Sequence, residues 1–133
     1  MTTLVDTSAL FALISEGDPG HARALEWLEN VAAHEDASLI THNYVMAETI
    51  ALTHARLGTP AIRLLIDDVL PMCEIRFVDE ELHERAVAAF LAGLGRRASF
   101  VDRTSFELMR SEGIERAFAF DRDFDREGFA TVP

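Results

Sequence analysis

The chain has 133 residues, of which 49% are hydrophobic, and a formal net charge of −11. This length suits one compact domain with a full hydrophobic core, so we expect a single domain over residues 1–133. The acidic balance argues against a protein that binds duplex nucleic acid by broad neutralisation of phosphates, because such proteins usually carry a basic face. All twelve basic side chains are arginines, which excludes any mechanism that needs a lysine.

The positive charge is unevenly distributed along the chain. Residues 1–94 hold five arginines against fifteen acidic residues, whereas residues 95–133 hold seven arginines against eight. The C-terminal third is therefore where a polyanion would be tolerated. No run of about 18 apolar residues is present, and the first residues do not resemble a secretory signal, so we expect a cytoplasmic protein without a membrane span. Cys73 is the only cysteine and is expected to be a small buried hydrophobe.

Strand-like and helix-like segments alternate from the N-terminus. Thr2 to Val5 predicts a short β-strand that ends at Asp6, and Thr7-Ser8 offers a cap for the apolar helix that follows, to Ile14. Asp18-Pro19 predicts the start of a second helix, since aspartate is a good N-cap and proline suits the first helical position. The expected buried face of that second helix comprises Ala22, Leu25, Trp27 and Leu28.

The next two segments repeat this order. Ser38 to Thr41 predicts the second strand, and His42-Asn43 caps a helix on which Glu48 emerges after the first turn. Thr59-Pro60 predicts a further helix that Pro71 stops. On the helix that His42-Asn43 caps, the positions expected to face inward are Val45, Met46, Thr49, Ile50 and Leu52.

The C-terminal half contains the remaining strands and helices. Cys73 to Val78 predicts the third strand, and Asp79 caps the helix after it. Ser99 begins a further helix, which Gly113 ends. The last two strands are expected at Ala117 to Phe120, followed by Asp121, and at Phe129 to Val132.

Strands separated by helices imply a mostly parallel sheet of four to five strands with helices on both faces, that is, one three-layer α/β/α domain. In such sheets ligands bind beyond the carboxyl ends of the strands, where the strand order reverses. Asp6 and Asp121 end strands at that edge, and Glu48 and Asp102 lie early in helices that begin there. We expect these four carboxylates to share a pocket. Their mutual repulsion would be relieved by a divalent cation, and oxygen ligands suit Mg²⁺ or Mn²⁺.

The sequence leaves the roles of two of these four acids open. Asp102 stands three residues after Ser99, so it can complete a capping box and complement the helix dipole without any further role. Asp121 is followed by Asp123 and Asp125, which would share its side of an extended segment and could replace or assist it.

Four short blocks contain the acids described above: Val5-Asp6-Thr7-Ser8-Ala9-Leu10, Asn43-Tyr44-Val45-Met46-Ala47-Glu48-Thr49, Ser99-Phe100-Val101-Asp102 and Phe120-Asp121-Arg122-Asp123-Phe124. Together they resemble the blocks of PIN-domain nucleases, in particular the VapC-type ribonuclease toxins. Each block alone recurs by chance, but their order and spacing cover nearly the whole chain. The resemblance implies a PIN-like fold and a Mg²⁺- or Mn²⁺-dependent endoribonuclease. It also implies a small cognate antitoxin and a homodimer.

In this interpretation Asp6 and Asp102 are the main metal ligands and catalytic residues, while Glu48 and Asp121 hold coordinated water or a second ion. Thr7 or Ser8 would orient a ligand carboxylate. The sequence departs from the family at Ala119, where a threonine or serine is usual. That departure keeps open an alternative, a catalytically silent PIN-like module that binds RNA or protein.

Five arginines flank the third and fourth blocks and have two possible roles. They would either contact RNA phosphates or remain solvated and shield the acids. They are Arg96, Arg97, Arg103, Arg122 and Arg126. If the enzyme has an antitoxin, we expect the antitoxin to cover the carboxylates or to place an arginine among them.

Overall fold

Five short parallel strands form the centre of the computed structural model, which describes residues 1–133. They are β1 (Thr2–Val5), β2 (Ser38–His42), β3 (Glu74–Arg76), β4 (Arg116–Phe118) and β5 (Ala130–Val132). Their spatial order is β3-β2-β1-β4-β5, and every neighbouring pair is parallel. The chain builds outward from β1 through β2 to β3, then returns to the other side of β1 with β4. The strand order therefore reverses between β1 and β4, at the centre of the sheet.

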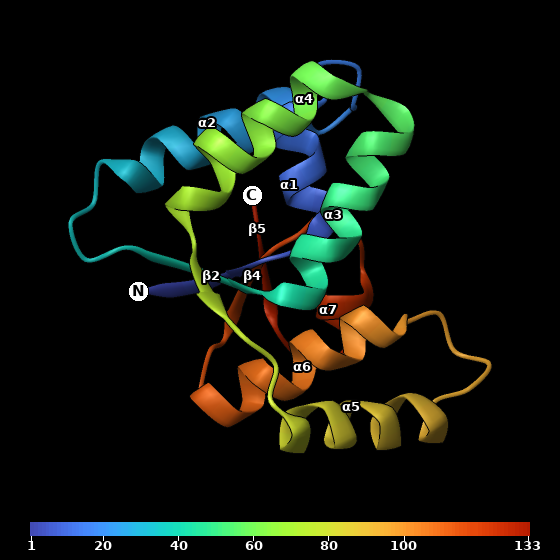
Figure 1. Ribbon diagram of the computed structural model, residues 1–133. Helices are drawn as coiled ribbons and strands as arrows, with labels where there is room; N and C mark the ends of the chain where they lie inside the picture. The colour runs from blue at the N-terminus through green and yellow to red at the C-terminus, as the bar shows by residue number, and fades with distance from the viewer.

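Helices cover both faces of this sheet (Figure 1). The first group is α1 (Thr7–Ile14), α2 (His21–Ala32), α3 (Asn43–Arg56) and α4 (Thr59–Leu64), which continues through η1 (Leu65–Val69) and η2 (Leu70–Met72). The second group is α5 (Glu80–Ala92), α6 (Phe100–Glu112) and the single turn α7 (Asp123–Arg126). This arrangement is the predicted three-layer α/β/α domain with a parallel sheet, and the fold prediction is confirmed.

Each layer of helices encloses its own hydrophobic core. Leu10, Leu65 and Phe118 belong to the core beneath the first group, and Phe106 and Phe124 to the core beneath the second. The adjacent β1 residues Leu4 and Val5 face opposite cores, as the period of two in a strand requires. Central strands buried on both faces leave only their ends for a polar site. No helix is both long and apolar enough to cross a membrane.

The second helix begins later than the sequence predicts. Asp18 accepts a hydrogen bond from the Gly20 amide (2.8 Å) and so closes a turn, and α2 starts only at His21. A Cβ at Gly20 would lie 2.8 Å from the Phe120 ring, so the chain passes too close to that ring for a larger residue. The predicted buried face is wrong at Ala22 and Leu25, which are exposed; Ala24 is buried, and Trp27 and Leu28 are half-buried.

Two further helical segments differ from their predictions. Gly58, at a positive φ of 81°, is the N-cap of α4 in place of Thr59, and the helix runs on to Met72 through irregular turns. The sequence did not predict the short helix α7, which the structure contains. Because residues 123–126 are helical, alternation along an extended chain does not apply to Asp121, Asp123 and Asp125.

Candidate active site

Asp6 leaves the carboxyl end of β1 and is the N-cap of α1. Its Oδ2 accepts hydrogen bonds from the Ser8 amide (3.1 Å) and the Ser8 hydroxyl (2.7 Å). The same hydroxyl accepts a hydrogen bond from the amide of Phe120 (3.0 Å), which follows β4. Asp6 is only 3% exposed. Of the two hydroxyls expected to orient a carboxylate, Ser8 therefore contacts Asp6, and it also joins the ends of the two central strands.

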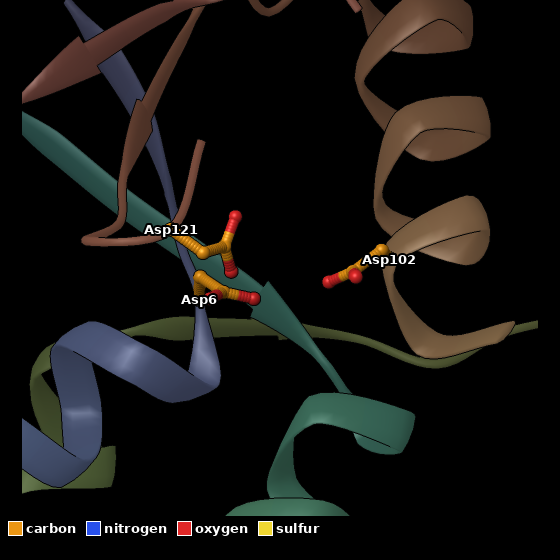
Figure 2. A group of neighbouring side chains, drawn as sticks. All are labelled: Asp6, Asp102 and Asp121. Carbon is orange, nitrogen blue, oxygen red and sulfur yellow. The ribbon is translucent and has the colours of Figure 1, made fainter. Parts of the chain in front are cut away.

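Asp102 lies in the first turn of α6 and completes the predicted capping box. Its Oδ2 accepts a hydrogen bond from the Ser99 amide (2.9 Å), and the Asp102 amide donates to the Ser99 hydroxyl (3.1 Å). The capping role does not exclude a second role, because a carboxylate has acceptor sites to spare. Figure 2 shows the Asp102 side chain pointing from α6 toward Asp6 and Asp121. The same side chain thus caps its own helix and faces the other two acids.

Asp121 follows β4 and completes a group of three, which we call the acid trio: Asp6, Asp102 and Asp121. Its Oδ1 accepts a hydrogen bond from the Asp123 amide (3.1 Å), which holds the turn after the strand. One carboxylate oxygen from each member of the trio lies within 4.8 Å of the others (Figure 2). The trio stands at the switch point between β1 and β4, where the topology predicts a ligand site.

Three other acids that the sequence suggested lie outside this group. Glu48 is exposed on α3, because its neighbour Thr49 takes the buried position and donates to the Val45 carbonyl (2.7 Å). Asp123 pairs with Arg126 (3.1 Å), and Asp125 accepts from the Thr131 hydroxyl (2.8 Å). The expected cluster of four carboxylates is therefore a cluster of three.

No arginine or histidine forms an ion pair with any member of the acid trio. Burial raises the pKa of Asp6 to about 8, and the nearby charge of Asp121 adds to the rise. Burial also raises the pKa of Asp102 to about 6 and raises the pKa of Asp121. Three clustered carboxylates with only oxygen donors fit a hard divalent cation such as Mg²⁺ or Mn²⁺, whose charge would allow all three to ionise.

Glu127 is a charged residue near the site that the sequence did not single out. It accepts hydrogen bonds from Arg103 Nη1 (2.9 Å) and Arg110 Nη2 (2.7 Å). These contacts join positions 24 and 17 residues apart. No local periodicity connects residues at such separations, so only the folded chain reveals the pairing.

Residues 3–130 match the PIN domain family, and the chain belongs to this family. The resemblance seen in the four sequence blocks is thereby confirmed. Over 129 residues the chain is 35% identical to the 23S rRNA-specific endonuclease VapC20 of Mycobacterium tuberculosis, and the match covers 96% of this chain and 95% of the relative.

Solved structures agree with this assignment. The crystal structure of M. tuberculosis VapC20, a toxin that cleaves the sarcin–ricin loop, superposes with a TM-score of 0.85 at 33% identity, covering 98% of this chain and 97% of that one. VapBC2 of Rickettsia felis, bound to a DNA fragment from its promoter, has a TM-score of 0.72 at 12% identity and covers 98% and 97% of the two chains. At that low identity the second similarity concerns the fold alone.

Proposed function

We propose that the chain is a divalent-metal-dependent endoribonuclease and the toxin of a toxin–antitoxin pair. The observation that carries the proposal is the acid trio, one buried and two half-buried carboxylates without a cationic partner at the switch point of the sheet. A cluster of this kind lowers stability unless a cation binds, so structural reasons alone do not account for it. The similarity to an rRNA endonuclease of the same family supports the ribonuclease activity.

Asp6, Asp102 and Asp121 are assigned as the residues that hold Mg²⁺ or Mn²⁺. When bound, such a cation polarises a phosphate oxygen and lowers the pKa of the attacking water. The chain's own contribution is to fix the ligands: Ser8 holds Asp6, Ser99 holds Asp102, and the Asp123 amide holds Asp121. Ligands that are oriented before the metal binds require little rearrangement during the reaction.

The alternative of a silent binding module rested on the missing hydroxyl at Ala119. Ala119 is 5% exposed and packs in the core beneath α6. The acid trio is assembled without that hydroxyl, and Ser8 already supplies one between Asp6 and the end of β4. The enzyme is therefore the better-supported interpretation.

For the substrate we propose structured ribosomal RNA of the sarcin–ricin type, the RNA cleaved by the relative at 33–35% identity. The test is cleavage of an oligoribonucleotide with that loop, beside an unrelated hairpin, with Mn²⁺ or Mg²⁺ and with EDTA. We expect Asp6→Asn and Asp102→Asn to reduce metal-stimulated cleavage by about 100-fold or more, since several kcal/mol of charge stabilisation depend on the ligands.

Asp125→Asn is the matched control for this experiment, because Asp125 binds Thr131 and lies outside the acid trio. Glu48→Gln tests whether the exposed fourth acid takes part. Undiminished cleavage in both the Asp6 and Asp102 variants would contradict the assignment of the site.

The proposed antitoxin is a small protein that covers the acid trio or places an arginine in it, because a guanidinium there relieves the repulsion between the carboxylates. Co-expression with the product of a short adjacent reading frame should abolish cleavage. When that product is replaced by a variant without arginines, cleavage should be inhibited only in part. The homodimer stays a prediction, which sedimentation of the purified chain would check.

A further inference from the structure

A depression of about 320 Å³ lies beside the acid trio, between α6, α7 and the loop that joins α5 to α6. Four arginines and two acidic residues line it, and we call it the arginine pocket: Arg96, Arg97, Arg103, Arg126, Asp123 and Glu127. The lining has an excess of two positive charges in a chain whose net charge is −11. The pocket is therefore positively charged although the chain as a whole is strongly acidic.

The wall of the pocket is built around a buried arginine. Arg103 is 9% exposed, its Nη1 donates to Glu127, and its Nε has no partner. Glu127 is shared with Arg110, so one carboxylate faces two guanidinium groups. A Cβ at Gly93 would lie 2.7 Å from Arg103 Nη2, which shows how closely the loop covers this group. Arg110 also pairs with Glu107 (3.8 Å), so these contacts fix the wall of the pocket without adding net charge to it.

The rim of the pocket offers free donors. Arg96 and Arg97 are exposed, and neither forms an ion pair or a side-chain hydrogen bond. Every other arginine of the lining has an acidic partner within the protein. Two adjacent unpaired guanidinium groups provide planar pairs of N–H donors, the geometry that binds phosphate oxygens in a bidentate manner.

The pocket adjoins the acid trio. Asp123 lines the pocket, and its amide donates to Asp121 Oδ1 (3.1 Å). Arg103, also in the lining, directly follows Asp102 on α6. Two members of the trio are thus in direct contact with, or next in sequence to, residues of the pocket, so an RNA strand with one phosphate at the trio passes close to the pocket. Because the chain as a whole is strongly acidic, a polyanion needs such a site to remain at the trio.

We propose that the arginine pocket binds a backbone phosphate of the RNA substrate adjacent to the phosphate that is cleaved, with Arg96 and Arg97 as the direct contacts. Arg103 and Arg126, paired with Glu127 and Asp123, hold the wall of the pocket in place, and Arg96 and Arg97 account for its excess positive charge. This inference rests on the proposed ribonuclease function. It adds a substrate-positioning role for residues outside the acid trio.

The test compares the double variant Arg96→Gln/Arg97→Gln with the charge-matched control Arg56→Gln/Arg63→Gln, whose arginines lie on α3 and α4 in the other layer. Binding of a fluorescent oligoribonucleotide is measured by anisotropy with Ca²⁺ in place of the catalytic ion, at several salt concentrations. We expect the pocket variant to bind about tenfold more weakly and its salt slope to fall by about 1.4, since each lost contact to single-stranded RNA removes about 0.7. The control should stay within about twofold.

Kinetics and a small anion separate this inference from the ribonuclease proposal. In the pocket variant KM should rise while kcat changes little, because the acid trio is untouched. Inorganic phosphate should shift the backbone amide resonances of Arg97 and Ala98 in the wild type and not in the variant. Both arginines are exposed and unpaired, so the pocket variant should melt at the same temperature as the wild type. A lower melting temperature would reveal a folding defect.

Equal RNA affinity and salt slope in the pocket variant and the control would overturn the inference, even if the wild type cleaves RNA. A response to free phosphate without any loss of RNA affinity would overturn it as well. If the wild type cleaves no RNA but the pocket variant loses RNA affinity, the ribonuclease proposal fails while the phosphate site stands. Binding of an acidic peptide, with RNA affinity unaffected, would replace RNA with protein as the ligand.

Discussion

Asp102 and Arg103 are neighbours on α6, yet they belong to two charge clusters of opposite design. Asp102 joins the acid trio, in which like charges meet without a counter-ion. Arg103 joins Glu127 and Arg110, in which each charge contacts an opposite one. The paired cluster balances its charges within the chain, whereas the carboxylates of the acid trio have no cationic partner within ion-pair distance. The difference supports the proposal that the trio binds a cation while the paired cluster has a structural role.

The largest expected effect tests the claim that the acid trio is strained. The folded-state pKa of Asp6, about 8, exceeds the ordinary value of 3.8, so its contribution to stability is full below 3.8 and is lost as pH rises through about 8. Asp6→Asn removes this loss and keeps a good N-cap. In metal-free buffer at neutral pH we expect the variant to be more stable by about 3 kcal/mol in thermal melts.

Mg²⁺ provides the control for that measurement. It should raise the melting temperature of the wild type, because a ligand that binds only the folded state stabilises it, and should have little effect on the variant. A lower melting temperature for Asp6→Asn without metal would mean that the trio is a structural feature and not a strained site.

The next effect tests the paired cluster. Glu127→Gln leaves Arg103 buried beside Arg110 without a carboxylate, and we expect a loss of about 2 kcal/mol in denaturant unfolding, reduced from the fully buried case because Glu127 is partly exposed. Glu112→Gln is the control, since its pair with Arg76 is more exposed and should contribute less than about 1 kcal/mol. Equal losses in the two variants would remove the distinction between the buried pair and an ordinary surface pair.

A smaller effect concerns the support of the acid trio. Ser8→Ala removes the hydroxyl that bonds both Asp6 and the Phe120 amide, and we expect metal-stimulated RNA cleavage to fall about tenfold. Thr49→Val is the matched control. It also removes a buried hydroxyl, but one that forms no hydrogen bond with the acid trio, so the variant should retain nearly full activity. Similar activity in the two variants would show that Asp6 is positioned by the backbone alone.

The smallest effect separates the pH response of the trio from that of a buried histidine. His42 Nδ1 accepts from the Val45 amide and Nε2 donates to Ser105, and burial lowers the pKa of His42 to about 4. Because this value is below the ordinary 6.5, stability from His42 is lost as pH falls from 6.5 toward 4, opposite in sign to Asp6. Between about pH 7 and 5.5 the loss should be about 1 kcal/mol.

The matching variant for that effect is His42→Asn, which retains a capping acceptor at the start of α3. The raised pKa of Asp6 stabilises both proteins on acidification, so the informative quantity is the difference in stability between variant and wild type. As pH falls from about 7 to 5.5, that difference should shift by about 1 kcal/mol in favour of the variant in thermal melts. A difference that does not change with pH over this range would mean that the assignment to His42 is wrong.

Much of the fold was predictable because its determinants are local. A few neighbouring residues encode each of the features that were predicted correctly. These are the strand at Thr2–Val5, the helix caps at His42, Asp79 and Ser99, and the glycine that ends α6. The predictions failed at α2 and α7. Before α2, Asp18 closes a local turn with Gly20 instead of capping the helix, and Phe120 packs closely against that turn. At α7, Phe124 is buried in the core beneath α6, a contact with residues far along the chain.

The sequence by itself determined the α/β class, the family and three of the acids in the site, because alternating periods and carboxylates at strand ends and helix starts are properties of short segments. Only the tertiary structure decided that Glu48 stays outside the acid trio, that Ser8 links Asp6 to the chain after β4, and that Glu127 is shared by two arginines. These are contacts between side chains far apart along the chain. Their geometry follows from how the layers pack, which no local pattern specifies.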